Sequence, residues 1–429
     1  MSRVIAIDLG STKIVGIAGE KIDDNLYRVI AYGEAPSEGI EHGYVVAPGK
    51  VAAVVETILK KIKAEQGIAD VKDVFVNIMG KSVKYQKYTT SIMHENSSEL
   101  ISVNEIGKLE KDAYNMHMQA GEEVRHVVPQ DYIIDDESNI DDPIGRLGHK
   151  ISGNFLVIVG DMESAKRIKM CTNKLSLNLS VRKFIFEPVA IARAVLSEEE
   201  KKVGVALIDI GGGTTKLLVY KNGVLQHVTV YGLGGDSVTK DIAKVFGLLP
   251  ERAEEIKLKC SCMPKNIPDN KEVKIKGING REDYYIPLLK VSEVIRARIN
   301  EIMDTILQDV KLKSLSAGLV LTGGASQMID LCEFMREKTG LYIKTGKSEC
   351  ISDDSPAKDE ISHRKYATAT GLLIYGTDYL EYLEENEEEE SAVDNHDNDS
   401  GDHKDIKVPW WKEILKIIKN FFTQQQEVE

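Results

Sequence analysis

Cysteine is scarce in this sequence, and long apolar runs are missing. Five cysteines occur among 429 residues, scattered and odd in number, which favours a reducing compartment and argues against a disulfide framework. The one close pair, Cys260 and Cys262, has no further ligands at the spacing of a zinc site. Asp8 interrupts the apolar run at the start of the sequence, so we expect no signal peptide. No apolar stretch reaches the roughly 20 residues that a membrane-spanning helix needs.

Acidic residues outnumber basic ones, 68 to 55. The formal net charge is −13, so we do not expect nucleic acid as a partner. Most of the excess acid lies between residues 384 and 405, and the rest of the chain is close to balanced. A length of 429 residues is too long for one ordinary core and predicts two or more domains.

The usual nucleotide-binding motifs are absent, but two other glycine-bearing turns are present. No G-x-x-x-x-G-K-[ST] sequence occurs, and both turns lead into a returning strand, which disfavours a dinucleotide fingerprint. The related stretches are VIAIDLGSTKIVGIAGE at 4–20 and VALIDIGGGTTKLLVYKNG at 205–223. Each contains an apolar run, Asp-x-Gly, small hydroxylated residues, a lysine and a second apolar run, and each continues into a third strand and a helix. This duplication predicts two similar domains that face each other.

Both turns have the chemistry of an anion site. Glycine leaves backbone N–H groups open to solvent, and consecutive N–H groups form a nest for phosphate. The strand-end carboxylates Asp8 and Asp209 would lie beside such an anion only with a divalent cation between them, as hydrated Mg²⁺ allows. One such turn alone is often an ordinary β-turn, but two copies predict two hairpins around one polyphosphate. The expected phosphate-side residues are Gly10, Ser11, Thr12, Lys13, Gly211, Gly212, Gly213, Thr214 and Thr215.

Two smaller units are predicted outside the repeat. Residues 85–160 read as an α+β insertion, with a helix that begins at the capping box Ser102–Glu105 and with separate strands at 124–128 and 132–134. Residues 250–313 mix helices with a hairpin that turns at Asn279-Gly280.

The end of the sequence changes composition twice. A helix over 366–382 closes the globular part, and residues 383–407 are then acidic and polar, which predicts a disordered linker. Residues 408–423 predict an amphipathic helix with lysines opposite its apolar face. Aromatic anchors beside lysines favour a helix lying on anionic lipid, and a helix docked on the body or on another protein is the plainer alternative. The apolar face consists of Trp410, Trp411, Ile414, Leu415, Ile418, Phe421 and Phe422.

The order of these motifs resembles the actin-like ATPase superfamily, which includes actin, DnaK-type chaperones and sugar kinases. DLGSTK at 8–13 and DIGGGTT at 209–215 match its two phosphate loops, and LTGGAS at 321–326 matches its adenosine loop. FEPVAIARA at 186–194 and YATATGLLIYG at 366–376 match its two connecting helices. The resemblance implies an α/β, actin-like fold of two duplicated ribonuclease-H-like domains, with ATP and Mg²⁺ between them.

The same resemblance implies roles for individual residues. Glu187 would position an attacking water, with Asp8 and Asp209 as the other catalytic carboxylates and as Mg²⁺ ligands through water. A slow or vestigial ATPase and a nucleotide-gated polymer without fast turnover remain alternatives. An ordinary helical pair is the alternative for Glu254 and Lys257. The further nucleotide contacts would be Gly234, Gly235, Glu254, Lys257, Gly323, Gly324 and Ala325.

The insertion is similar to that of the FtsA family of bacterial cell-division proteins. HVVPQDYIIDDESNIDDPIGRLG at 126–148 and EGIEHGYVV at 38–46 carry this resemblance, with Arg146 where the family usually has methionine. A linker at 383–407 and a membrane-targeting helix at 408–423 would follow the body. The implied division of the body is subdomain 1A at 1–84 and 161–196, an inserted subdomain 1C at 85–160, subdomain 2A at 197–247 and 314–382, and subdomain 2B at 248–313.

The family resemblance implies a partner for each surface. The chain would polymerise into actin-like filaments on the cytoplasmic face of the cell membrane at the division septum, with anionic lipids and other division proteins as partners. Subdomain 2B would receive the C-terminal peptide of FtsZ through Arg298 and Glu301, for which an ordinary surface ion pair is the alternative. A small-molecule kinase and a pilus-assembly or chaperone-type ATPase of the same superfold are the alternative functions.

Overall fold

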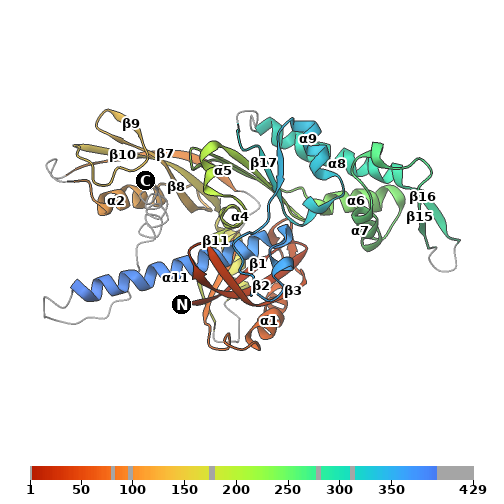
Figure 1. The fold of residues 1–429 in the computed structure, drawn as a ribbon, viewed down its shortest axis with the longest axis horizontal. Helices are drawn as coiled ribbons and strands as arrows, with labels where there is room; N and C mark the ends of the chain where they lie inside the picture. The colour runs from red at the N-terminus through yellow and green to blue at the C-terminus, as the bar shows by residue number, and fades with distance from the viewer. Residues whose placement is uncertain are drawn as a thin grey trace.

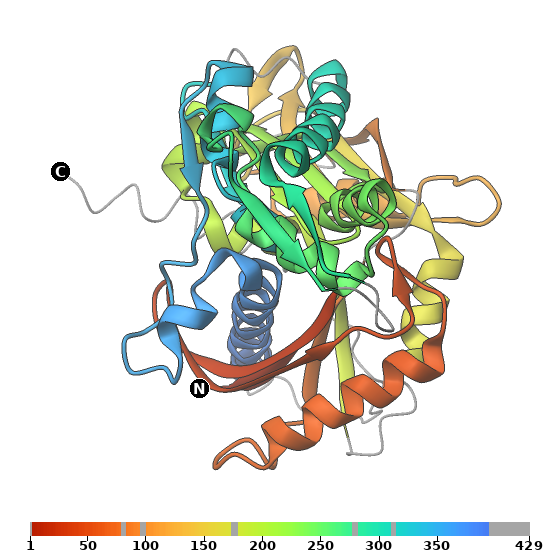
Figure 2. The ribbon, with the colours of Figure 1, turned by 90° about the vertical axis from the view of Figure 1, so that its right-hand side faces the viewer.

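The computed structural model describes residues 2–78, 83–94, 100–172, 179–276, 282–309 and 315–393. The body consists of two halves, each with a five-stranded sheet, and two helices lie between the sheets (Figures 1 and 2). A smaller unit extends from the body at either end of the long axis in Figure 1.

The first sheet has the strand order β11-β6-β1-β2-β3. Strands β1, β2 and β3 form an antiparallel meander, and β6 and β11 join it in parallel. Strand β1 is buried along almost its whole length, which explains why it is continuously apolar instead of alternating. The strands are β1 Arg3–Leu9, β2 Lys13–Asp23, β3 Leu26–Pro36, β6 Asp73–Ile78 and β11 Ser180–Phe186.

The second sheet repeats this topology in the order β14-β13-β12-β17-β18. Strands β12 to β14 form the meander, and β17 and β18 join in parallel. The predicted duplication of a three-stranded unit is therefore confirmed. The strands are β12 Val205–Ile210, β13 Thr215–Lys221, β14 Val224–Tyr231, β17 Leu319–Thr322 and β18 Ile343–Thr345.

Helices α4 (Glu187–Val195) and α11 (Ala367–Val393) lie between the two sheets (Figure 2). Their buried side chains share one continuous hydrophobic cluster with both meanders; Val15 contributes from the first sheet and Leu218 from the second. The two halves therefore have a common core, and these helices are its middle layer.

Other helices cover the outer faces of the sheets. Helices α1 and α3 pack on the first sheet, and α6, α7, α8 and α9 pack on the second. The helices are α1 Pro48–Lys63, α3 Met162–Thr172, α5 Glu198–Val203, α6 Gly235–Phe246, α7 Pro250–Lys259, α8 Leu288–Asp309, α9 Leu331–Thr339 and α10 Lys358–Ile361. Short elements complete the body: β4 Ile40–Glu41, β5 Tyr44–Val45, and the 3₁₀ turns η1 Pro264–Asn266, η3 Gly324–Gln327 and η4 Arg364–Tyr366.

The insertion is a four-stranded sheet with one helix, at the left of Figure 1. Its elements are β7 Lys84–Met93, α2 Val103–Tyr114, β8 Glu122–Ile134, β9 Glu137–Ile140 and β10 Lys150–Asp161. The capping box at Ser102 and Glu105 forms as predicted. The prediction of two separate strands was wrong, because β8 continues through Pro129. The register between β8 and β10 shifts beside Pro129, and such a bulge tolerates proline.

The unit at the right of Figure 1 contains α7, η1, α8 and a hairpin of β15 (Glu272–Ile275) and β16 (Tyr284–Pro287). The predicted hairpin is confirmed, and its predicted Asn279-Gly280 turn lies outside the described residues.

The C-terminal helix is longer than predicted. Helix α11 continues to Val393, so residues 383–393 are helical where the sequence predicted a disordered linker. Glutamate has a high helix propensity, and a run of it can extend a helix that packing has already nucleated. The rest of the predicted linker and the whole predicted amphipathic helix, residues 408–423, lie outside the described residues. Within the described part of the chain, no helix is long and apolar enough to cross a membrane.

Candidate functional site

The two glycine turns lie against each other at the end of the gap between the halves. His42 Nδ1 donates to the carbonyl oxygen of Gly213 at 3.1 Å, and the backbone N–H of Gly43 donates to Ser11 Oγ at 2.8 Å. A Cβ at Gly212 would lie only 1.8 Å from Thr12 Oγ1. The second turn therefore needs glycine because the first turn approaches it so closely.

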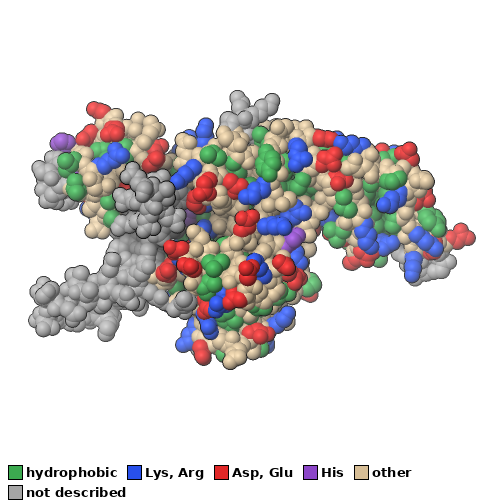
Figure 3. Space-filling view, in the orientation of Figure 1, with side chains coloured by type: hydrophobic (Ala, Val, Ile, Leu, Met, Phe, Trp, Pro, Cys, Tyr) green, Lys and Arg blue, Asp and Glu red, His purple; other side chains and the backbone are tan. Residues whose placement is uncertain are grey.

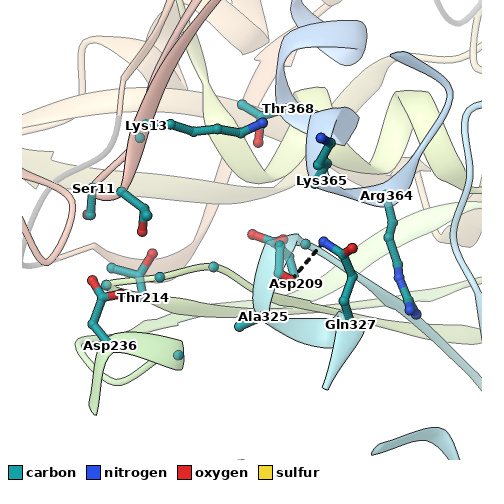
Figure 4. A pocket seen from close by; sticks show the side chains of 18 of the residues that line it. Ser11, Lys13, Asp209, Thr214, Asp236, Ala325, Gln327, Arg364, Lys365 and Thr368 are labelled. Atoms are coloured by element: carbon teal, nitrogen blue, oxygen red, sulfur yellow. Dashed lines mark hydrogen bonds between the residues drawn. The ribbon is translucent and has the colours of Figure 1, made fainter. Parts of the chain in front are cut away.

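A cavity of about 350 Å³ opens beside these turns. In the space-filling view, acidic and basic side chains both line the hollow between the halves (Figure 3). In close-up, Ser11 and Lys13 face Asp209, Thr214 and Asp236 across it (Figure 4). The lining includes these residues predicted from the sequence: Asp8, Gly10, Ser11, Thr12, Lys13, Glu187, Asp209, Gly211, Gly212, Gly213, Thr214, Gly235, Glu254, Lys257, Gly323, Gly324 and Ala325.

Two predicted residues do not line the cavity. Thr215 is fully buried, and its hydroxyl donates to the carbonyl oxygen of Leu233 at 2.8 Å. A Cβ at Gly234 would lie 2.4 Å from the carbonyl oxygen of Gly212, so Gly234 supports the back of the turn. Both residues hold the second glycine turn in place from behind. The sequence did not indicate that Thr215 and Gly234 lie behind the turn and not in the cavity. Their position depends on how the loop between β14 and α6 packs against the turn.

Three side chains, one amide and two carboxyl groups, meet at the floor of the cavity. Asn77 Nδ2 donates to Asp8 Oδ1 at 3.1 Å and to Glu187 Oε2 at 3.3 Å. Asn77 Oδ1 in turn accepts the backbone N–H of Leu9 at 2.7 Å, which holds the end of β1. Burial, reinforced by repulsion from Glu187, raises the pKa of Asp8 to about 8. The parallel pairing of β1 and β6 places Asn77 here, and no local sequence motif indicated it.

Lys216 is a further residue that was not predicted from the sequence, and it supplies a buried positive charge at this floor. Its ammonium lies 2.6 Å from Glu187 Oε1 and 2.7 Å from Asp209 Oδ2, with all three side chains buried. Burial alone would lower the pKa of Lys216, but attraction by Asp209 and Glu187 raises it well above its usual value. The signal was present in the hairpin, because Lys216 pairs directly with Asp209 across β12 and β13.

The other basic residues that line the cavity lie on its walls, away from the floor that holds Lys216. Lys13 Nζ lies 2.7 Å from Glu34 and 3.6 Å from the centre of the Tyr366 ring. Arg364 and Lys365, on η4, also line the cavity. Arg364 Nη1 is buried and has no hydrogen-bond partner among the described residues, so a donor for an anionic or polar ligand is left over. Neither Arg364 nor Lys365 carried a signal in the sequence.

The adenosine side predicted from LTGGAS is also brought to the cavity. Gly323 has a φ of +92°, and a Cβ there would lie 2.2 Å from Asp209 Oδ1. Lys257, on α7, is buried and donates to the carbonyl oxygen of Gly235 at 3.2 Å and to Thr239 Oγ1 at 2.9 Å. Its ammonium also lies 2.6 Å from Glu254 Oε2, so the predicted helical pair does form.

The predicted FtsZ contacts lie elsewhere, on α8. Arg298 donates to both carboxylate oxygens of Asp241, at 2.6 and 3.0 Å, and it also contacts Glu301. Arg298 therefore ties α8 to α6. No cluster of three or more potential metal ligands of the His, Cys, Asp and Glu types occurs in the described ranges.

Comparison with known proteins gives the family. The family model described as "Cell division protein FtsA" matches residues 206–371, and the model described as "SHS2 domain inserted in FTSA" matches residues 80–159. The chain belongs to the FtsA family. The FtsA insertion model coincides with the four-stranded unit, so the resemblance inferred from residues 126–148 is confirmed.

Similar FtsA proteins span most of the chain. The FtsA of Escherichia coli (strain K12) is 29% identical over 389 residues, which cover 87% of this chain and 90% of that protein. The FtsA of Pseudomonas aeruginosa is 28% identical over 380 residues, covering 87% and 89%.

Solved structures show the actin-like fold. The PilM–PilN type IV pilus biogenesis complex aligns with a TM-score of 0.60 and 14% identity, covering 87% of this chain and 98% of that chain. MreB5 of Spiroplasma citri bound to AMPPNP aligns with a TM-score of 0.54 and 12% identity, covering 90% and 99%. The predicted two-domain actin-like fold with an FtsA-type insertion is therefore confirmed.

Proposed function

We propose that this FtsA-family chain binds ATP in the cavity between its halves. The observation that carries the proposal is the pair of opposed glycine turns that line one cavity together with Lys13, Lys365 and Arg364, whose Nη1 atom has no partner among the described residues. Such a set of N–H groups and cations suits a polyphosphate. A volume of about 350 Å³ falls within the range of small-molecule sites. MreB5, a structure of similar fold, is bound to AMPPNP, which supports a nucleotide here.

Individual residues receive roles under this proposal. The backbone N–H groups of the two glycine turns hold the phosphates, with Ser11, Thr12 and Thr214 as hydroxyl donors. Gly323, Gly324 and Ala325 leave room for the adenosine, and Lys257 with Glu254 borders it. Mg²⁺ bound with ATP would neutralise phosphate charge. Asp8 is the strand-end carboxylate that fits a hydrated ion, whereas Asp209 already contacts Lys216.

We further propose that nucleotide binding gates self-assembly of an actin-like cell-division protein at the membrane. Membership of the FtsA family supports the division role, and the apolar and lysine pattern of residues 408–423 supports attachment to anionic lipid on the cytoplasmic face at the septum. The chain would tether FtsZ filaments through its α7–α8 unit, with Arg298 and Glu301 as contacts. Glu187 would orient water if the site turns over at all, as a slow or vestigial ATPase.

Calorimetric titration of the purified full chain with ATP tests the nucleotide site. Arg364→Gln removes the unpartnered donor and is expected to weaken ATP binding about tenfold or more, the size of one lost charge-assisted hydrogen bond. Arg182→Gln is the matched control, because Arg182 pairs with Asp73 at the surface and does not line the cavity. Full-chain protein without measurable ATP affinity would refute the site.

Sedimentation with anionic vesicles tests the membrane role. The full chain is expected to sediment with vesicles of phosphatidylglycerol, and a chain without residues 408–429 is expected to stay in the supernatant. A small-molecule kinase of the same fold predicts no difference between the two. Capture of the full chain on an immobilised FtsZ C-terminal peptide, compared with a scrambled peptide, tests the tether.

A further inference from the structure

A short hairpin of the first half reaches the second glycine turn. Strand β4 ends at Glu41 and β5 begins at Tyr44, so the loop between them consists of His42 and Gly43 alone. Both loop residues have positive φ, +47° and +74°, as a type I′ turn requires. Histidine, asparagine and aspartate are the residues other than glycine that most often adopt this backbone. The hairpin tip, His42 and Gly43, therefore offers one imidazole and one N–H group.

The hairpin is anchored in the first half. Ile40 and Val45 are buried and belong to the hydrophobic core of that half. The carbonyl oxygen of Gly39 accepts the N–H groups of Val46 and Ala47, at 2.9 and 3.1 Å, and so closes the base of the hairpin. The position of the hairpin tip is therefore set by the first half and not by the turn that it contacts.

The hairpin tip contacts both glycine turns. In the first turn, Ser11 Oγ accepts the N–H of Gly43 at 2.8 Å. In the second turn, the carbonyl oxygen of Gly213 accepts from His42 Nδ1 at 3.1 Å. A carbonyl oxygen can only accept, so Nδ1 carries the proton. The packing is close, because a Cβ at Gly213 would lie 2.6 Å from Ser11 Oγ and 3.0 Å from His42 Cα.

Each of these contacts orients a donor of the cavity. The Ser11 hydroxyl has one proton, and that proton stays available for another acceptor because the oxygen accepts from Gly43. The carbonyl of Gly213 and the N–H of Thr214 belong to one planar trans peptide and point in opposite directions. Holding the carbonyl toward His42 therefore turns the N–H of Thr214 away from the hairpin tip. Ser11 and Thr214 face each other across the cavity, whereas His42 does not line it (Figure 4).

We propose that His42 and Gly43 are positioning residues for the phosphates of the nucleotide, through which one hairpin tip sets donors of both glycine turns. This inference rests on the proposed function, ATP binding in the same cavity. The donors that the tip orients, the Ser11 hydroxyl and the Thr214 N–H, suit the oxygens of an anion. Because the hairpin belongs to the first half and Gly213 to the second, the phosphate site is complete only when the two halves are in contact here.

The test is equilibrium binding of a fluorescent ATP analogue to the full chain in excess MgCl₂. His42→Gly keeps the left-handed backbone and removes the donor, so it is expected to weaken binding about threefold to tenfold, the size of one lost hydrogen bond. His42→Asn also tolerates this backbone and carries an amide N–H at about the distance of Nδ1 from the main chain. It is therefore expected to bind within about twofold of the unaltered chain.

Asn222→Gly is the matched control. Asn222 has a φ of +54° in the two-residue turn between β13 and β14, and it does not line the cavity. The change from a left-handed side chain to glycine is thus the same, and the affinity is expected to stay unchanged. Melting curves without nucleotide accompany each variant, and His42→Gly is expected to remain folded at the assay temperature because Ile40 and Val45 still anchor the hairpin.

The possible failures are distinguishable. An unaltered chain without ATP affinity refutes the proposed function, and this inference with it. Three results refute the positioning role and leave ATP binding intact: a loss of less than about threefold in His42→Gly, an equal loss in His42→Asn, or an equal loss in Asn222→Gly. Rescue by asparagine is the decisive result, because a loss caused only by a disturbed hairpin would not depend on which side chain donates to Gly213.

Discussion

Gly371 lies where helix α11 crosses helix α4, and replacing it with alanine tests how tightly the middle layer is built. A Cβ at position 371 would lie 1.9 Å from the carbonyl oxygen of Ala190 and 2.4 Å from its carbonyl carbon, far inside the 3.4 Å at which ordinary contact begins. Both atoms belong to the backbone of α4, so no side chain can rotate away. The two helices must separate or shift along each other.

The expected size of the effect combines two opposing contributions. Alanine in place of glycine inside a helix gains up to about 1 kcal/mol. Overpacking a close contact costs about 1–3 kcal/mol, and a clash with backbone belongs at the upper end or beyond. We therefore expect a net loss of about 2 kcal/mol, which lowers the melting temperature by roughly 4–8 °C if the body behaves as a domain of 150–250 residues.

Differential scanning calorimetry of the full chain measures this change. Gly49→Ala is the matched control, because Gly49 lies in the first turn of α1 and a Cβ there meets nothing within 4 Å. That control is expected to leave the melting temperature unchanged or slightly raised. A Gly371→Ala chain that melts at or above the unaltered chain would show that the helix crossing is not a tight contact.

Three further changes probe other parts of the chain. Gly234→Ala directs a Cβ at the carbonyl oxygen of Gly212, 2.4 Å away, and by displacing the second turn it is expected to weaken ATP binding about tenfold in a titration and to lower the melting temperature as well. Burial raises the pKa of Glu110 from 4.5 to about 8, so the folded chain keeps a proton that the unfolded chain loses, and stability falls as pH rises across that window. Glu110→Gln is expected to make this decline shallower in melting curves recorded between those pH values, and Asp8, whose pKa is also raised to about 8, accounts for part of what is left. Arg298→Ala is expected to cost about 1 kcal/mol in urea unfolding, and a double variant with Asp241→Ala should cost little more than either single variant, whereas additive losses would contradict a direct bond.

The general plan of the molecule could be predicted because its signals are local and repeated. Apolar runs, glycine turns and returning strands identify both meanders, and the turn residues Gly10 and Gly211 follow from the Asp-x-Gly pattern. The position of such a turn residue is determined by the hairpin in which it lies, so it can be predicted from the local sequence. Nearly all the residues predicted for the two turns accordingly line the cavity.

The remaining parts depend on contacts between distant segments. Asn77 reaches the site only through the parallel pairing of β6 with β1, and Arg364 arrives from η4, far along the chain. Lys216 could have been predicted from the strand register, because it pairs with Asp209 across the hairpin. The two motifs were instead aligned by their lysines, which equated Lys216 with Lys13, although Asp8 pairs with Val15. Thr215 was assigned to the phosphates, although its position beside Lys216 in the strand turns it toward Leu233.

Helices α4 and α11 form a layer that belongs to both halves of the body. Both sheets pack against the same two helices, so separating the halves would expose their common core. The insertion and the β15–β16 hairpin project from opposite ends of the molecule (Figure 1). Under the proposed function, a change of angle between the halves on nucleotide binding would displace both projecting units more than it displaces the cavity, because they lie far from the middle layer.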